Sequence, residues 1–285
     1  MSLDLDSRQR AMLDEMGVHV WWPETVVAAA PLPDPAPALP VAAPTAALAP
    51  IRPSAGASAP AATVLAAALP EGVAGTDWDA LAQSISQCGA CKLSTGRRAA
   101  VSAAGVTPGR ADWMVIGEPP DDNEERLGLP FAGQAGQLLD NMLKAVRVRR
   151  RGSDGSDVSA GAGMAYVSNC VKCRPARARN PEQQELASCE NYLLREVALV
   201  QPRVILALGR FAAQTLLQGT VPDVASTPLG KLRGRVYRYQ GIAVIVSYPP
   251  AYLLRTPQDK ARAWADLCLA QAALSAPTGT AFPGN

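Results

Sequence analysis

The chain has 285 residues, of which 48% are hydrophobic, so it is long enough to bury one sizeable core or two smaller ones. No uncharged apolar run is long enough to span a bilayer, and the opening residues MSLDLDSRQR carry acids where a signal peptide needs bases, so we expect a soluble cytoplasmic protein. The net charge of +2 by itself argues neither for nor against a nucleic-acid partner.

The N-terminal part differs in composition from the rest. Residues 1–23 place apolar side chains near one face of a predicted helix and end in VHVWWP, which indicates an amphipathic peptide that docks on a protein partner or folds back on the body. Residues 24–75 consist mostly of alanine and proline and predict a disordered linker, because they offer too few large side chains to offset the entropy of ordering. We also expect a disordered tail at 277–285.

The body, residues 76–276, alternates apolar strand patterns with helix patterns. The predicted strands are 113–118, 165–172, 204–209 and 242–248, and the predicted helices are 133–147, 181–199, 210–218 and 257–274. This order predicts an α/β fold, a three-layer α/β/α arrangement around a central, mainly parallel four-stranded sheet. Ligands of such folds bind beyond the carboxyl ends of the strands. Residues 149–163 are predicted to form a mobile surface loop.

The six cysteines point to metal or redox chemistry, since disulfides are rare in the cytosol. Cys170 lies inside a predicted strand and Cys268 inside the last helix, so both are expected in the core. The remaining four are Cys88, Cys91, Cys173 and Cys189. A four-thiolate site assembled from separate chain segments suits a structural zinc ion or an iron–sulfur cluster, and spacing alone does not separate the two.

The stretch VSYPPAYLLRTP, residues 246–257, ends a strand at two prolines, which fix the backbone and donate no hydrogen bond. We therefore expect a stiff loop that holds two leucines beside Arg255. A loop pushed into a partner would need both the leucines and the cation. The alternative is a core-packed leucine pair with an arginine that caps a helix.

Basic residues cluster at 147–151, 172–179 and 231–238. Each cluster is either a set of phosphate contacts or a solvated surface. A Schiff-base lysine is disfavoured, because neither Lys172 nor Lys231 has a sequence context that lowers its pKa, and surface phosphate contact is the expectation for both.

Several ordered motifs resemble the iron–sulfur uracil-DNA glycosylases of the family-four type over most of residues 85–272. They are GEPPDDNEERLGLPFAGQAGQLLDNML, NCVKCRP with a cysteine in the following helix, VILALGRFAAQTLL and YPPAYLLR. The resemblance implies that Cys88, Cys91, Cys173 and Cys189 hold a 4Fe-4S cluster, with zinc as the alternative. It also implies a partner, DNA that contains uracil, and a protein that acts as a monomer.

The resemblance assigns roles to three further residues. Phe131 would stack on an everted pyrimidine, Asn169 would read the O4 and N3 edge of uracil, and Glu118 would orient water or balance charge on the sugar. The alternatives are purely structural roles: core packing for Phe131, a turn cap for Asn169, and a helix-capping or surface acid for Glu118. Leu253 or Leu254 would fill the gap left by the flipped base while Arg255 holds a phosphate.

Two departures from the family pattern lower the expected activity. Pro119-Pro120-Asp121 replace the usual Ala-Pro-Gly, so backbone approach to a ligand is less easy and an added acid repels phosphate. Pro249 stands where the family has a histidine, and His19 is the only histidine of the sequence. Losing one donor to a developing anion typically costs about 10² to 10³ in rate.

The resemblance therefore implies a monofunctional DNA-repair hydrolase that removes uracil from deoxyuridine by base flipping. The alternative from another class is an iron–sulfur module of the same fold that binds DNA or a protein partner and has weak or no catalysis. A nucleotide-binding protein with a zinc site is disfavoured, because the sequence has no phosphate-cradling glycine motif.

Overall fold

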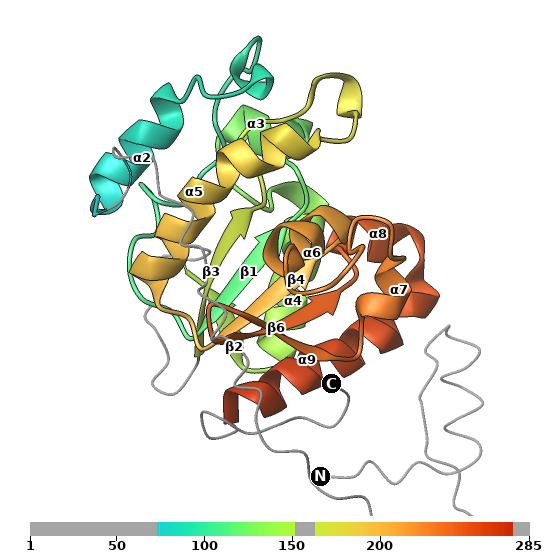
Figure 1. Ribbon diagram of the computed structural model, residues 1–285. Helices are drawn as coiled ribbons and strands as arrows, with labels where there is room; N and C mark the ends of the chain where they lie inside the picture. The colour runs from blue at the N-terminus through green and yellow to red at the C-terminus, as the bar shows by residue number, and fades with distance from the viewer. Residues whose placement is uncertain (1–72, 74, 152–162, 276–285) are drawn as a thin grey trace, which may run out of the picture. The chain divides into compact units, whose positions relative to one another are not determined.

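The computed structural model describes residues 73, 75–151 and 163–275 (Figure 1). The expectations for residues 1–23, 24–72 and 277–285 lie outside this described part of the chain. Its strands form one six-stranded sheet in the order β2-β3-β1-β4-β6-β5. They are β1 (Trp113–Gly117), β2 (Val148–Arg150), β3 (Gly163–Asn169), β4 (Val204–Leu208), β5 (Val236–Tyr239) and β6 (Ile242–Ser247).

The four inner strands match the predicted ones, since β1, β3, β4 and β6 are the near-continuous apolar runs of the sequence. Neighbouring strands are parallel except at β5, which pairs antiparallel with β6. Every residue of β1 and of β4 is buried, as expected for strands covered on both faces.

The prediction of four strands missed the two edges. β2 lies in an arginine-rich stretch that was expected to belong to the loop 149–163, and residues 152–162 of that loop are outside the described residues. β5 and β6 are joined by Gln240 and Gly241, which have φ of 50° and 81°. Positive φ at both positions is typical of the two-residue turn that closes a hairpin.

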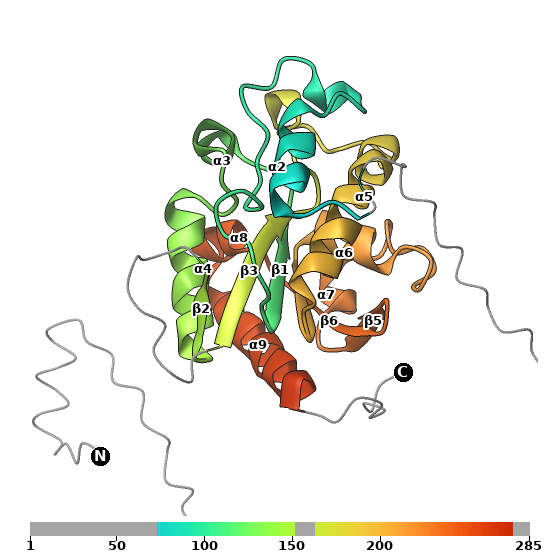
Figure 2. The same cartoon turned by 90° about the vertical axis from the view of Figure 1, so that its left-hand side faces the viewer.

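Helices cover both faces of the sheet (Figures 1 and 2). One face packs against α2 (Trp78–Gln87), α5 (Gln183–Val200) and α6 (Arg210–Leu217), and the other against α4 (Gly133–Ala145) and α9 (Lys260–Ser275). Each layer buries an apolar stripe, with Leu193 and Val197 on the first face and Leu139 and Leu143 on the second. The predicted three-layer α/β/α fold is confirmed.

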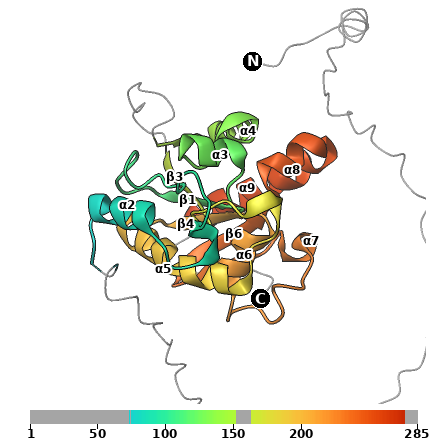
Figure 3. The same cartoon turned by 90° about the horizontal axis from the view of Figure 1, so that it is seen from above.

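Short elements gather at the carboxyl end of the parallel strands. They are η1 (Lys92–Ser94), α3 (Asp122–Leu127), η2 (Ala176–Ala178), α7 (Leu229–Leu232), α8 (Pro250–Arg255) and η3 (Pro257–Asp259). In Figure 3, which looks onto this end, α3, α5, α6 and α8 lie around the strands. None of the helices in the described ranges combines the length and the apolar character that crossing a membrane requires.

Candidate active site and cysteine group

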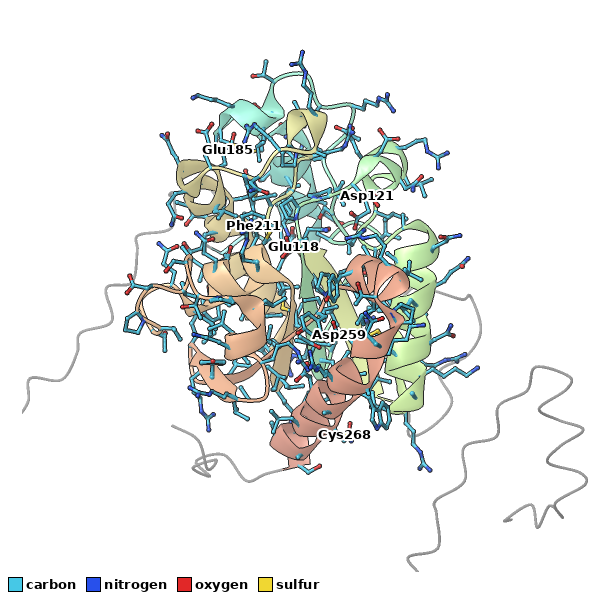
Figure 4. The ribbon with its side chains drawn as sticks, turned by 90° about the vertical axis from the view of Figure 1, so that its right-hand side faces the viewer. Glu118, Asp121, Glu185, Phe211, Asp259 and Cys268 are labelled. Carbon is cyan, nitrogen blue, oxygen red and sulfur yellow. The ribbon has the colours of Figure 1, made fainter. Side chains whose placement is uncertain are left out.

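Glu118 follows β1 directly and lies against the start of α6. Its Oε1 accepts a hydrogen bond from the backbone N–H of Phe211 at 2.9 Å, and Figure 4 places the two residues side by side. Gly209 makes this approach possible, because its φ is 114° and a Cβ there would overlap the Glu118 carboxylate. The carboxylate therefore sits at the positive end of a helix, which stabilises its ionised form.

Burial dominates the charge state of Glu118. It raises the pKa of this carboxyl from 4.5 to about 7, although the Phe211 N–H and the Arg210 guanidinium both lower it. A carboxyl with this pKa is partly ionised at neutral pH, so it can accept a proton from water and release it again.

Asn169 ends β3 beside Glu118 and is 3% exposed. Its Nδ2 donates to the Glu118 carbonyl oxygen at 2.9 Å and to Oε1 of Glu124 at 3.2 Å. Its Oδ1 is buried and has no hydrogen-bond partner within the described residues. A buried acceptor without a donor is costly in a folded protein, so this oxygen is suited to accept an N–H from a ligand.

Glu124 joins the groups around Asn169 and was not predicted from the sequence. Its Oε1 accepts from the Phe131 backbone N–H at 2.5 Å, and its Oε2 accepts from the Asp121 N–H at 2.7 Å. The Asp121 side chain in turn accepts from the Glu124 N–H, which completes a capping box at the start of α3. Burial raises the pKa of the Glu124 carboxyl, and the N–H groups of Asp121 and Phe131 lower it.

Phe131 lies at the same edge of the sheet. Its φ is 54°, and its ring packs on Gly117, where an added Cβ would come within 2.5 Å of Cζ. Since Gly117 pairs with Asn169 in the sheet, the ring lies beside the end of β3 as well. The ring also belongs to the apolar core on the α4 side, so Phe131 is both a core residue and a wall of this edge.

The segment expected to be a stiff loop is the short helix α8, with Pro249 as its N-cap and Pro250 as its first residue. Proline is favoured at that first position, because the missing N–H would have no partner inside the helix. Leu253 is 1% exposed, so its side chain is not available to enter DNA. Leu254 is 42% exposed. Arg255 is exposed, and Pro249 is half-buried.

The four candidate ligand cysteines come from three segments. Cys88 and Cys91 are half-buried, and Cys173 and Cys189 are buried. The Cys173 sulfur accepts from Nη1 of Arg97 at 2.9 Å, and the Cys189 sulfur accepts from the Lys172 N–H at 3.2 Å.

The pKa shifts place these thiols in one region. Burial raises the pKa of the Cys189 thiol to about 12, and Cys173 and Cys88 contribute to the rise. Burial also raises the pKa of the Cys173 thiol, to which Cys91 and Cys88 add and which Arg97 opposes. Cys88 therefore interacts electrostatically with Cys173 and Cys189, and Cys91 interacts with Cys173. Within the described ranges, however, no three thiol, imidazole or carboxylate groups are arranged to hold a single metal ion.

The other two cysteines differ from each other. Cys170 is fully buried, as predicted. The expectation that Cys268 lies in the core was wrong, because it is exposed on α9 (Figure 4). On that helix Ala263, Asp266, Leu267 and Ala270 face the interior, and one residue beyond Leu267 the helix has turned by about 100°.

The expectation of a surface phosphate contact for Lys172 was also wrong. Its side chain is 2% exposed and forms an ion pair of 2.7 Å with the fully buried Glu196 of α5. The Lys172 Nζ also donates to the Asn169 carbonyl oxygen at 3.2 Å. This pair ties the end of β3, between Asn169 and Cys173, to the helix that carries Cys189.

Two arginines of the basic cluster 172–179 also form ion pairs with glutamates. Arg174 pairs with Glu125 at 3.2 Å, and Arg179 pairs with Glu185 at 2.5 Å. Lys231 is exposed.

Comparison with known proteins shows the family to which the chain belongs. The family model described as the uracil DNA glycosylase superfamily matches residues 104–269. The chain is 34% identical over 184 residues to the type-4 uracil-DNA glycosylase of Archaeoglobus fulgidus, an alignment that covers 63% of this chain and 84% of the relative. It is 32% identical over 197 residues to the type-4 enzyme of Pyrobaculum aerophilum, with 68% and 92% covered.

A type-4 uracil-DNA glycosylase of Thermotoga maritima is 32% identical over 185 residues, which is 64% of this chain and 85% of the relative. The residues matched by the family model, 104–269, span β1 to α9 of the described body. The chain belongs to the uracil-DNA glycosylase superfamily, together with its type-4 members.

Proposed function

We propose that this protein is a monofunctional uracil-DNA glycosylase that flips deoxyuridine out of DNA and hydrolyses its N-glycosidic bond. The observation that supports the proposal most strongly is the buried Oδ1 of Asn169, which has no hydrogen-bond partner among the described residues. The amide nitrogen of the same side chain donates to the backbone carbonyl oxygen of Glu118, at the carboxyl edge of the sheet. Family membership supplies the reaction class, and these two residues supply the chemistry for it.

Asn169 is proposed to read the base. The N3–H of uracil is a donor that suits the free Oδ1, whereas N3 of cytosine is an acceptor and would face this oxygen with a lone pair. Both hydrogens of Nδ2 are already used by Glu118 and Glu124, so the amide orientation is fixed before a base arrives. A fixed acceptor of this kind rejects the wrong base by leaving buried polar groups unpaired.

Glu118 is proposed to act on the water and the sugar. In its ionised form the carboxylate accepts a proton from the attacking water and balances positive charge that develops at C1′. The start of α6 stabilises that form through the Phe211 N–H, while burial keeps the pKa near neutrality.

The exposed end of α8 is proposed to contact the duplex. Leu254 replaces Leu253 as the side chain that enters the stack, because Leu253 is buried in the core. Arg255, the next residue, is exposed and suited to a backbone phosphate.

Cys88, Cys91, Cys173 and Cys189 are proposed to hold a 4Fe-4S cluster, with zinc as the alternative. The chemistry of the donors suits either group, because all four side chains offer sulfur and the N–H donors from Arg97 and Lys172 favour a thiolate. Binding has to draw the sulfurs together, since no three of them are arranged to hold a single metal ion in the described residues. When bound, the group supplies a covalent cross-link between the segment after α2, the end of β3 and α5. The chain's own ion pair between Lys172 and Glu196 holds two of these segments in register.

A second function has one observation in its favour. Pro249 removes the imidazole that the resemblance expects, so a DNA-binding or partner-docking module with weak catalysis is the alternative. We also propose that the protein acts as a cytoplasmic monomer and that residues 1–23 bind a protein partner.

One assay separates the two functions. Purified protein is incubated with single-stranded and duplex oligonucleotides that carry one uracil, and abasic sites are cleaved with alkali. Strand scission at the uracil, absent from matched thymine and cytosine oligonucleotides, supports the glycosylase. A gel shift without scission supports the binding module.

A further inference from the structure

The proposed reaction leaves negative charge on the base without an imidazole to receive it. Uracil departs with the electron pair of the C1′–N1 bond, and that charge spreads over its ring and carbonyl oxygens. Pro249 occupies the position expected to hold histidine, and His19 is far away in the sequence, outside the described residues. Another donor near the end of β6 is therefore needed for an efficient reaction.

Arg210 is the cation that the sheet brings to this position. β4 pairs with β6 up to Leu208 and Ser247, and the Gly209 N–H donates to the Ser247 carbonyl oxygen at 3.0 Å. Arg210 is the first residue of α6. It therefore lies next to the end of β6, where the chain continues to Pro249.

The guanidinium of Arg210 is held at the same edge as Glu118. It lies 4.6 Å from the ring centroid of Phe211, the residue whose N–H binds the Glu118 carboxylate. The side chain is exposed, and no carboxylate of residues 73, 75–151 and 163–275 forms an ion pair with it. Stacking on the ring leaves the N–H groups at the edge of the guanidinium available to a ligand.

Arg233, another arginine near the end of β6, is already engaged. It forms an ion pair of 2.7 Å with the buried Asp266, and its guanidinium lies 4.3 Å from the ring centroid of Tyr248. Because the Arg233 guanidinium is mostly buried and already bound to a carboxylate, it is not available to bind a ligand anion, and Arg210 is the better candidate for this role.

We propose that Arg210 binds the negative charge on uracil as the glycosidic bond breaks, in place of the missing histidine. This inference rests on the proposed function. The C1′–N1 bond breaks with its electron pair on uracil, and a water oxygen forms the new bond to C1′. One water proton passes to Glu118 and then to solvent, and the uracil anion takes up a proton from solvent after release.

The test is single-turnover uracil release by wild type, Arg210→Gln, Arg210→Lys, Pro249→His and the double variant Arg210→Gln/Pro249→His. Rates are measured at pH 8.5, where Glu118 is ionised, so that loss of the neighbouring cation does not act through the carboxyl. Arg235→Gln is the matched control, because Arg235 is also exposed and the same charge is lost. Exposed positions such as these are not expected to change the melting temperature.

The proposal predicts that Arg210→Gln lowers the single-turnover rate about 10²-fold while DNA affinity changes less than about threefold. Arg210→Lys keeps part of the rate, and Pro249→His restores most of it in the Arg210→Gln background. Arg235→Gln stays at the wild-type rate. Non-additivity of Arg210 and Pro249 is the signature that a phosphate contact would not give.

Three outcomes overturn the role of Arg210. Arg210→Gln can retain the wild-type rate, or it can lose only affinity with a shallower salt dependence, as a phosphate contact would. In either case wild type still releases uracil, so the proposed function stands. A wild type that releases no uracil overturns the proposed function and this role with it.

Discussion

The side-chain amide of Asn169 donates to Oε1 of Glu124 at 3.2 Å, so a carboxylate of α3 holds the residue that ends β3. The same oxygen accepts the Phe131 N–H at 2.5 Å. One buried carboxyl thereby positions both the amide that we propose to read the base and the backbone of Phe131 at the edge of the sheet.

Glu124→Gln is expected to lower activity without removing any group that touches substrate. The new NH₂ group faces either the Asp121 N–H or both the Phe131 N–H and the Asn169 amide, so at least one N–H loses its acceptor, at a cost of about 1–3 kcal/mol. Thermal unfolding and kcat/KM on a uracil oligonucleotide measure the two effects. Asp122→Asn, exposed on the same helix, is the control and should remain close to wild type. Equal kcat/KM for Glu124→Gln and wild type would remove this support for Asn169.

Glu118 gives the reaction a pH dependence. Because burial raises the pKa of this carboxyl to about 7 and the ionised form is the active one, kcat/KM should rise with pH through about 7 and level off above about 8. Glu118→Gln should lower kcat/KM and flatten the profile. A wild-type profile that is flat between pH 6 and 8 would contradict the assignment.

The same shift affects stability in the opposite direction. Between pH 4.5 and about 7 the folded protein binds a proton at Glu118 that the unfolded chain has released, so this group lowers the free energy of unfolding as the pH rises. The difference in unfolding free energy between Glu118→Gln and wild type should therefore favour the variant more at pH 8 than at pH 5. Using the difference cancels the contribution of Glu124, whose pKa is also raised.

Serine substitutions separate ligand cysteines from structural ones. Cys173→Ser and Cys189→Ser should lose bound iron and visible absorbance after anaerobic purification and should unfold at lower temperature. Cys268→Ser, at an exposed position, should keep the iron content and the stability of wild type. Iron analysis, zinc analysis and absorbance spectra decide the metal. A colourless wild type with stoichiometric zinc would replace the cluster by the zinc alternative.

The buried pair of Lys172 and Glu196 should be costly to break from one side. Lys172→Met leaves a carboxylate with 0% exposure without its cation, which is expected to cost about 3–5 kcal/mol of unfolding free energy. The double variant Lys172→Met/Glu196→Leu removes both charges and should recover much of that loss. Chemical denaturation of the two variants tests this, and a double variant no more stable than Lys172→Met would contradict the ion-pair account.

Much of the fold can be predicted from the apolar runs of the sequence. The inner strands and the helices α4, α5 and α6 are predictable because they are long, buried and periodic. The positions of Asn169 and Glu118 at the carboxyl edge of the sheet are predictable for the same reason, since each lies at the end of a buried parallel strand. The edges β2 and β5 are short and contain arginine, so pattern alone does not distinguish them from loops.

Other features depend on tertiary packing that a sequence does not display. Glu124 lies in the acidic run DDNEE, which has the pattern of a solvated surface, but it is buried in the fold, where Phe131 and Asn169 donate to its carboxylate. Cys268 lies in a helix whose apolar residues are distributed around its whole circumference, so no periodicity marks the buried side. Lys172 was assigned to the surface because lysine is rarely buried, and its partner Glu196 is 24 residues away.

Release of free uracil under single-turnover conditions tests the central claim most directly. The substrate is a single-stranded oligonucleotide with one uracil, and the proteins are wild type and Asn169→Ala. The account predicts one uracil released per site by wild type, none from a matched cytosine substrate, and a rate at least about 10²-fold lower for Asn169→Ala. Absence of release by folded wild type, or an unchanged rate for Asn169→Ala, would contradict it.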